Sequence, residues 1–197
     1  MRPKYEISNK LTVIAFAYGI LLALPAAAIA ADYKIDPAHS FVQFRVSHLG
    51  IGWVYGRFNT LAGDFTYDPA APPSAQKVSV TIDTSSIDTN HAERDKSLRS
   101  PKSLDVETYP EMTFVSTDFL GDADGGTLTG DLSLHGVTKS ISFPVKRIAE
   151  GDDPWGNYRA GFEGKYTLVR ENFGLTRNLG PKGVSVYIDL IVEGIRQ

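Results

Sequence analysis

Apolar and polar residues alternate along several segments of the chain, and this period-two pattern most constrains the fold. In one segment, Val78, Val80 and Ile82 alternate with polar residues, and the pattern recurs in four further segments: 42–47, 128–135, 141–146 and 184–193. Side chains of a strand point alternately to opposite faces, so each segment predicts a strand with one buried face. Parallel strands buried on both faces are continuously apolar, so the sheet is predicted to be antiparallel.

Turn-forming residues separate these segments. Loops are predicted at the Gly-, Pro- and Asp-rich segments 68–73, 121–126, 151–156 and 178–183. The aromatic-rich segments between them are also predicted to be strands, with a bend or bulge at Gly63: 53–67, 112–119 and 158–169. The total is about eight strands, the number that closes a small barrel around a filled interior or one small ligand.

One segment lacks the alternation and predicts a helix. Asn90 with Glu93 resembles a helix N-cap and its partner, and the helix would run over 91–99 until Pro101 stops it. Pro101 could also open a second short turn of helix with Ser100 as its cap. We therefore expect a short helical segment near residues 91–106, lying as a lid or plug at one end of the barrel.

The first thirty residues have the three parts of a secretory signal peptide. A positively charged start is followed by the apolar segment Leu11–Leu24, and Ala28-Ile29-Ala30 forms an A-x-A cleavage site. The apolar segment has 14 residues, whereas a membrane span needs about 20. We expect cleavage after Ala30, or alternatively after Ala31, which leaves residues 31–197 as one exported domain without stable membrane insertion.

Composition and motifs exclude several function classes. The chain has no Cys, so it can form neither a disulfide scaffold nor a thiol or Cys-ligated metal site. A net charge of −3 argues against a nucleic-acid partner. No G-x-S-x-G motif is present, and no metal-ligand spacing joins the four histidines, which are His39, His48, His91 and His135. We therefore predict no catalytic residue, no metal ligand and no cofactor.

Two features leave alternatives open at this stage. The apolar strand faces either fill the barrel or line a cavity, and alternation alone favours the filled core. The helical segment carries a basic cluster, which is either an anion-binding mouth or an ordinary solvated helix surface: Arg94, Lys96, Arg99 and Lys102, with His91 near its start. Surface charge of this kind is common, so the solvated helix is favoured.

A set of short motifs, in this order, resembles the YceI-like family of exported lipid-binding proteins over nearly all of residues 32–197. The matching stretches are 33–36; 48–50 with 55–58; 88–95 with 98–100; Tyr109-Pro110 with Phe114; 130–132 with 136–139; and 151–156 with 160–162.

The resemblance implies an all-β, lipocalin-like, eight-stranded antiparallel barrel. It implies a lumen that holds an isoprenoid or similar amphiphile, such as a polyprenyl phosphate, a polyprenyl quinone or its precursor, or a fatty amide. It also implies a periplasmic location and a link to stress. The role would be carriage, storage or stress protection, and a monomer and a homodimer both remain open.

Alternation, taken with the resemblance, assigns candidate ligand contacts. An unpaired charge in the lumen would cost several kcal/mol, so inward positions should be uncharged. The predicted lumen residues are Val42, Phe44, Val46, Phe58, Phe65, Val80, Ile82, Phe114, Leu132, Leu134, Phe143, Phe162, Tyr166, Val186 and Ile188. The candidates for contact with a polar head group are His48, His91, Arg94 and Arg99.

Two competing functions remain. The first is an enzyme that acts on a lipid in the same lumen, which needs a histidine or carboxylate pair inside it, for example His48 with His91. The second is a filled-barrel stress or interaction protein, which would show a large exposed apolar patch and no cavity.

Overall fold

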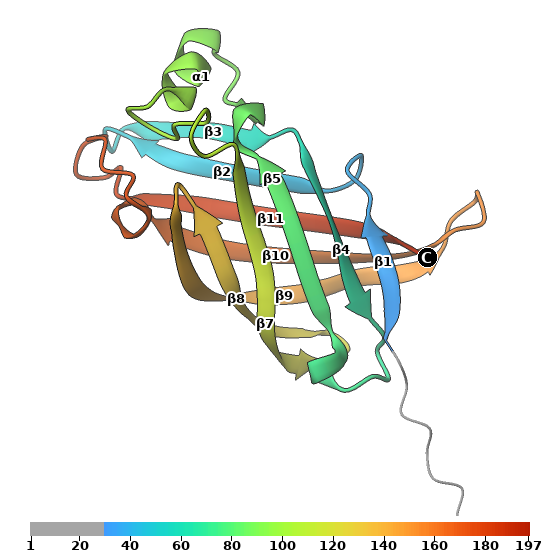
Figure 1. Cartoon of the computed structure of the whole chain (residues 1–197). Coiled ribbons are helices and arrows are strands. Elements are labelled where there is room, and N and C mark those ends of the chain that lie inside the picture. Colours follow the sequence, from blue (N-terminus) through green and yellow to red (C-terminus); the bar gives the residue numbers. More distant parts are fainter. Residues whose placement is uncertain (1–29) are drawn as a thin grey trace, which may run out of the picture.

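Residues 30–197 are described by the computed structural model, so the predicted signal peptide lies outside the described residues except for Ala30. Eleven strands form one antiparallel sheet (Figure 1). They are β1 (Ala31–Ile35), β2 (Phe41–His48), β3 (Gly52–Phe58), β4 (Leu61–Tyr67), β5 (Lys77–Asp83), β6 (Ile87–Asp88), β7 (Glu111–Asp122), β8 (Gly125–Leu134), β9 (Val137–Asp152), β10 (Tyr158–Val169) and β11 (Ser185–Arg196).

Short helices complete the fold. They are the α-helix α1 (Ala92–Arg99) and the 3₁₀ helices η1 (Pro73–Ala75), η2 (Thr84–Ser86) and η3 (Arg170–Phe173). Within residues 30–197, no helix has the length and apolar character needed to cross a bilayer.

Eight of the strands close into a ring, which confirms the predicted eight-stranded antiparallel barrel. The order around it is β1-β4-β5-β7-β8-β9-β10-β11, and β1 pairs with β11 to complete the circuit. The closing ladder joins Tyr33 to Arg196 and Ile35 to Gly194. A closed ring leaves no unpaired edge along this ladder, so the strands enclose an interior.

The remaining three strands, β2, β3 and β6, extend the sheet beyond the ring. Residues 186–191 of β11 pair with β2, whereas residues 194–196 of the same strand pair with β1. The sheet therefore divides along β11. One branch closes the barrel, and the other carries β2, β3 and β6 towards α1 (Figure 1).

The segment 53–67, predicted to be aromatic-rich strand, forms two strands that are separated at Asn59 and Thr60. Gly63 pairs with Val80 in an unbroken register, so the bulge predicted as one alternative there is wrong. Shifts in register occur elsewhere, between Ser116 and Asp118 in β7 and next to Gly161 in β10.

Gly130 occupies an inward position of β8 where alternation would place an apolar side chain. A Cβ atom there would lie 2.5 Å from the Phe114 ring. The ring of Phe114 therefore occupies the space that a side chain at position 130 would need.

The helix occurs where predicted, but its start differs. His91 is the N-cap, since its Nδ1 accepts a hydrogen bond from the backbone N–H of Arg94. Asn90 has a left-handed backbone (φ 61°) and lies one residue earlier. The second helix predicted after Pro101 is wrong: residues 101–108 form a series of turns.

A cluster of charged side chains lies beside the ladder of β1 and β11 that closes the barrel. The Arg159 side chain of β10 donates to Asp36 (2.7 Å), Glu193 (2.6 Å) and Asp153 (2.6 Å). It thereby joins the end of β1, strand β11 and the β9–β10 loop. Arg159, followed by His39, lowers the pKa of Asp36 from 3.8 to about 2, and Arg159 also lowers the pKa of Asp153.

We predict that Arg159→Gln lowers the stability of the barrel at neutral pH and reduces the loss of stability that acid causes. The folded Asp36 has a pKa below its unfolded value of 3.8. Its contribution to stability is therefore complete above about pH 4 and is lost as the pH falls towards about 2. Urea unfolding midpoints at neutral pH and between pH 4 and 2 would measure the effect.

The matched control is Lys165→Gln, which removes a cation whose side chain is 78% exposed and lies 3.6 Å from Asp189. This variant should change the midpoint little. Identical acid profiles for Arg159→Gln and the unmutated protein would contradict the assigned role of Arg159.

Candidate ligand-binding cavities

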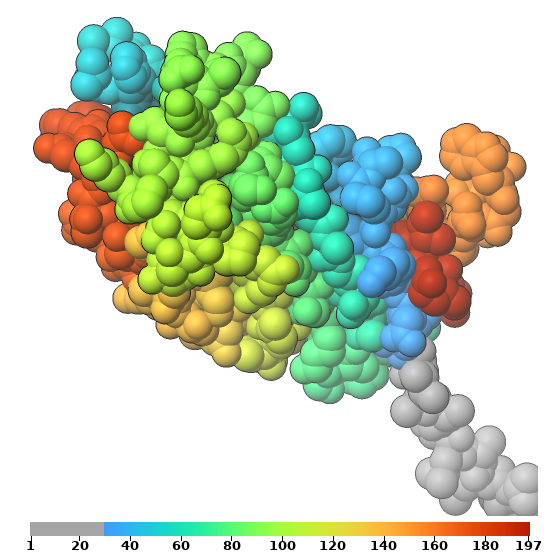
Figure 2. All heavy atoms as spheres, turned by 45° about the horizontal axis from the view of Figure 1, so that its top comes forward, coloured from blue at the N-terminus to red at the C-terminus, as the bar shows by residue number. Residues whose placement is uncertain are grey.

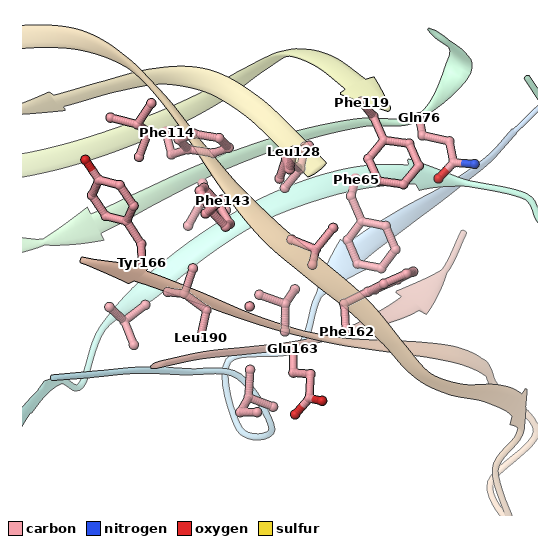
Figure 3. A pocket seen from close by; sticks show the side chains of 18 of the residues that line it. Phe65, Gln76, Phe114, Phe119, Leu128, Phe143, Phe162, Glu163, Tyr166 and Leu190 are labelled. Atoms are coloured by element: carbon pink, nitrogen blue, oxygen red, sulfur yellow. The ribbon is translucent and has the colours of Figure 1, made fainter. Parts of the chain in front are cut away.

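The barrel ring encloses a cavity of about 200 Å³, here called the first cavity. Most of its wall comes from the ring strands, and Val42 of β2 also lines it. Figure 3 shows aromatic side chains from different strands pointing towards the common space, among them Phe65, Phe114, Phe143 and Phe162. The interior is therefore not completely filled, in contrast to the filled core that alternation alone favours.

Aromatic rings in contact form much of this wall. Phe114 lies 5.5 Å from Phe143, and Phe143 lies 6.0 Å from Tyr166, measured between ring centroids. Near the β1–β4 side, Phe162 packs edge-on against Phe65 and Tyr67 at 5.5 and 4.9 Å. Aromatic pairs at these distances contribute about 0.5–1.5 kcal/mol each beyond the area they bury, so the rings stabilise one another along the wall.

A second cavity of about 130 Å³ lies where the sheet divides. Its walls come from β2, β3, the start of β11, the segment that follows α1, and the loop 174–184. In Figure 2 the segment around α1 (yellow-green) and this loop (orange-red) cover the same end of the molecule. The prediction that the helical segment covers one end of the barrel agrees with this arrangement.

The two cavities share part of their walls. Four side chains line both of them: Val42, Met112, Leu168 and Ile188. All four are apolar, so the shared wall offers no strong binding site for water. Met112 is unbranched and adapts its shape more readily than its neighbours. A chain that occupied both cavities would have to pass these four side chains.

Polar groups of the first cavity lie at its rim or stay neutral. Its charged lining residues, Lys77, Asp122 and Glu163, are all exposed. Burial raises the pKa of Tyr166 and raises the pKa of Tyr67 to about 12, so both phenols are uncharged at neutral pH. The deep part of the cavity thus presents apolar surface and neutral hydroxyl groups.

The structure places every predicted lumen residue on one of the two cavities. Those on the second cavity alone are Phe44, Val46, Phe58, Leu134 and Val186. Those on the first are Phe65, Val80, Ile82, Phe114, Leu132, Phe143, Phe162 and Tyr166, and Val42 and Ile188 line both. Their contact with a lipid stays a prediction. Further wall residues were not predicted, although alternation marks several of them: Met112, Leu128, Leu168, Leu190 and Val192.

The predicted head-group residues are not brought together in the same way. His48 and His91 are exposed, and neither is among the described residues that line the two cavities. The predicted enzyme pair His48 and His91 therefore does not converge inside the lumen.

Arg94 and Arg99 bind the polypeptide backbone instead of facing a cavity. Arg94 donates to the Thr89 carbonyl (2.6 Å), and Arg99 donates to the carbonyls of Ser85 (2.7 Å) and Ile87 (2.6 Å). These bonds attach α1 to the segment before it. The arginines that do line the second cavity are Arg170 and Arg177, which sequence reasoning missed.

One group of side chains has the composition of a metal site. Ligand atoms of Asp36, His39 and Glu193 lie within 4.8 Å of one another. Both carboxylates already accept hydrogen bonds from Arg159, whose positive charge opposes a cation at the same place. We therefore interpret this cluster as the ion-pair network of the barrel closure.

The chain matches relatives over almost its full length. The model of the YceI-like domain matches residues 33–193. A UPF0312 protein of Pseudomonas aeruginosa is 52% identical over 190 residues, which cover 95% of this chain and 99% of that protein.

Solved structures share the fold. BcnA of Burkholderia cenocepacia superimposes with a TM-score of 0.71 at 22% identity, covering 81% of this chain and 98% of that one. A polyisoprenoid binding domain from Saccharophagus degradans, implicated in plant cell wall breakdown, has a TM-score of 0.63 at 20% identity over 85% and 99% of the two chains. The family model and the close relative together show that this chain belongs to the YceI-like family.

Proposed function

We propose that this protein binds a long-chain lipid, an isoprenoid or a similar amphiphile, in its two adjacent cavities, with the chain passing from one to the other beside Met112. The observation that carries the proposal is the apolar first cavity of about 200 Å³, which shares part of its wall with a second apolar cavity. An apolar cavity of about 150 Å³ stays free of water and binds benzene in another protein, so a larger one of the same kind suits a hydrocarbon chain.

The energetics favour chains over compact ligands. Burial of each CH₂ group contributes about 0.8 kcal/mol, and the gain grows along the chain until the cavities are filled. Ordering the chain opposes part of this gain. Branched or unsaturated chains fit equally well, because contacts between methylene groups and aromatic walls carry little geometric information. Selectivity for the tail should therefore be loose.

Binding rather than catalysis is the function that the site supports. The histidine pair considered for catalysis, His48 and His91, lies outside the cavity linings, and the ionisable residues Lys77, Asp122 and Glu163 of the first cavity are exposed at its rim. The neighbouring fold from Saccharophagus degradans is described as a polyisoprenoid binding domain. That description is consistent with an isoprenoid ligand for this protein.

The proposed location is the periplasm, and the proposed role is carriage, storage or stress protection of the lipid. The basis is the sequence of residues 1–30, with its basic start, its apolar segment of 14 residues and its A-x-A site. A soluble domain that shields an isoprenoid chain from water would serve any of these three roles.

We predict that Val80→Trp abolishes lipid binding without unfolding the barrel. Val80 lines the first cavity, and an indole ring there would occupy the space of the lipid chain. Organic extraction and mass spectrometry of the purified variant should find little lipid where the unmutated protein carries it. Its affinity for hexadecanol, measured by displacement of the neutral probe N-phenyl-1-naphthylamine, should fall by about tenfold or more.

The matched control is Val115→Trp on the neighbouring strand β7, where Val115 is 49% exposed on the outer face. This variant should bind lipid normally. Normal binding by folded Val80→Trp would rule out the first cavity as the lipid site.

We predict that Met112→Trp shortens the chain that the protein can hold. In the unmutated protein, affinity for a series of alcohols should rise with each added CH₂ group, because the chain extends past Met112 into the other cavity. In the variant the rise should stop at a shorter chain, while decanol binds as before. Met112→Leu keeps the volume of the side chain, so its affinity should rise with chain length as in the unmutated protein. If the affinity rose with chain length in the same way for all three proteins, a chain that passes Met112 between the cavities would be contradicted.

We predict that the exported protein begins at Ala31, or at Asp32 if cleavage follows Ala31. Intact mass spectrometry of the periplasmic fraction would identify the N-terminus. Ala30→Leu places a large residue at the A-x-A site and should leave the precursor uncleaved. An N-terminus at Met1 in the periplasmic form of the unmutated protein would contradict the signal peptide.

A further inference from the structure

Two arginines, Arg170 and Arg177, line the second cavity among side chains that are otherwise almost entirely apolar. Apart from them, the only polar side chain of that lining is Ser103. Within residues 30–197, neither arginine forms an ion pair with a carboxylate. Arg170 is partly buried and Arg177 is exposed, so the cost of a charge without a carboxylate partner falls mainly on Arg170.

Both arginines are held in place by the loop 174–184. Arg170 donates from Nη1 to the Gly183 carbonyl (2.9 Å) and from Nη2 to the Arg177 carbonyl (2.6 Å). Arg177 donates from Nη1 to Ser97 Oγ at the end of α1 (2.8 Å). A guanidinium has five N–H donors, so these bonds use only part of the capacity of each side chain.

The electrostatics of the pair favour an anion. Burial lowers the pKa of Arg170, the positive charge of Arg177 lowers it further, and the exposed Glu171 partly opposes both effects. Arg170 therefore lies in a net positive environment beside the exposed Arg177, and no carboxylate of residues 30–197 forms an ion pair with either. A phosphate or carboxylate offers oxygens in the planar geometry that guanidinium groups bind with two parallel hydrogen bonds.

We propose that Arg170 and Arg177 bind the anionic head group of the lipid, so that the ligand is a single-chain amphiphile ending in a phosphate or a carboxylate. The head would lie against the two arginines in the second cavity, and the tail would pass Met112 into the first. This proposal rests on the proposed function and adds the polarity and chemical class of the ligand. It replaces the earlier candidates Arg94 and Arg99.

The test compares ligands with one tail and different heads on the delipidated protein. Hexadecyl phosphate, hexadecanoate, hexadecanol and hexadecyltrimethylammonium would each displace N-phenyl-1-naphthylamine. We expect the two anions to bind about tenfold or more tightly than the alcohol, and the cation to bind most weakly. Added salt should reduce the advantage of the anions, and the order of phosphate and carboxylate identifies the preferred head.

Arg177→Gln should remove the advantage of the anions while the alcohol binds as before, and Arg177→Lys should restore part of it. Arg57→Gln, on the exposed face of β3, is the control and should keep the full preference. Equal affinity of the unmutated protein for anions and alcohol would overturn the head-group assignment and leave lipid binding intact. If no ligand with this tail binds, the proposed function itself fails. The comparison of head groups needs no variant, so it decides the matter even if Arg177→Gln does not fold.

Discussion

The backbone ladder between β1 and β11 is the constraint on which the rest of the molecule depends. It turns an open antiparallel sheet into a ring of eight strands and so creates an inside. Eight strands are near the size at which a barrel is either filled by its own side chains or holds one small ligand. Here the interior holds a cavity of about 200 Å³, and the Phe114 ring that lines it packs against Gly130, where a side chain would collide with it. The Arg159 network reinforces the ladder from outside, at a place where its charges do not reach the lumen.

The division of the sheet along β11 explains why there are two cavities. Since β1 takes only the last part of the β11 edge, β2 pairs with the part before it and carries β3 away from the ring. The space between this branch, α1 and the loop 174–184 becomes the second cavity. The two spaces differ in the charges that line them, with mixed charges at the exposed rim of the first and arginines in the second. A ligand with a charged head and an apolar tail should therefore bind in one preferred orientation.

Local sequence patterns predict which side chains face the interior, because this depends on strand periodicity. They fail for side chains whose positions depend on contacts between distant segments. Alternation assigns Phe143 or Val186 to the inside because neighbouring side chains of a strand must point to opposite faces, and every predicted lumen residue does line a cavity. The helix cap was assigned to Asn90 by its residue type, yet the backbone there is left-handed and His91 caps the helix instead. The arginines of the second cavity were missed because their positions come from bonds to Gly183 and to Ser97, which is 80 residues away in the chain. A basic cluster on one helix was visible in the sequence, whereas a pair assembled by a loop was not.

The distribution of polar groups suggests how one barrel can accept tails of many shapes and still select one class of head group. The first cavity presents apolar side chains and neutral phenols. Tails of many shapes are therefore removed from water to a similar extent and make similar apolar contacts there. A charged head group cannot follow the tail into that space, because it would leave water without a partner. In our proposal it lies instead against Arg170 and Arg177, whose N–H donors stand beside apolar walls. The loop that holds the arginines therefore selects the head group, and the strands of the barrel accommodate the tail.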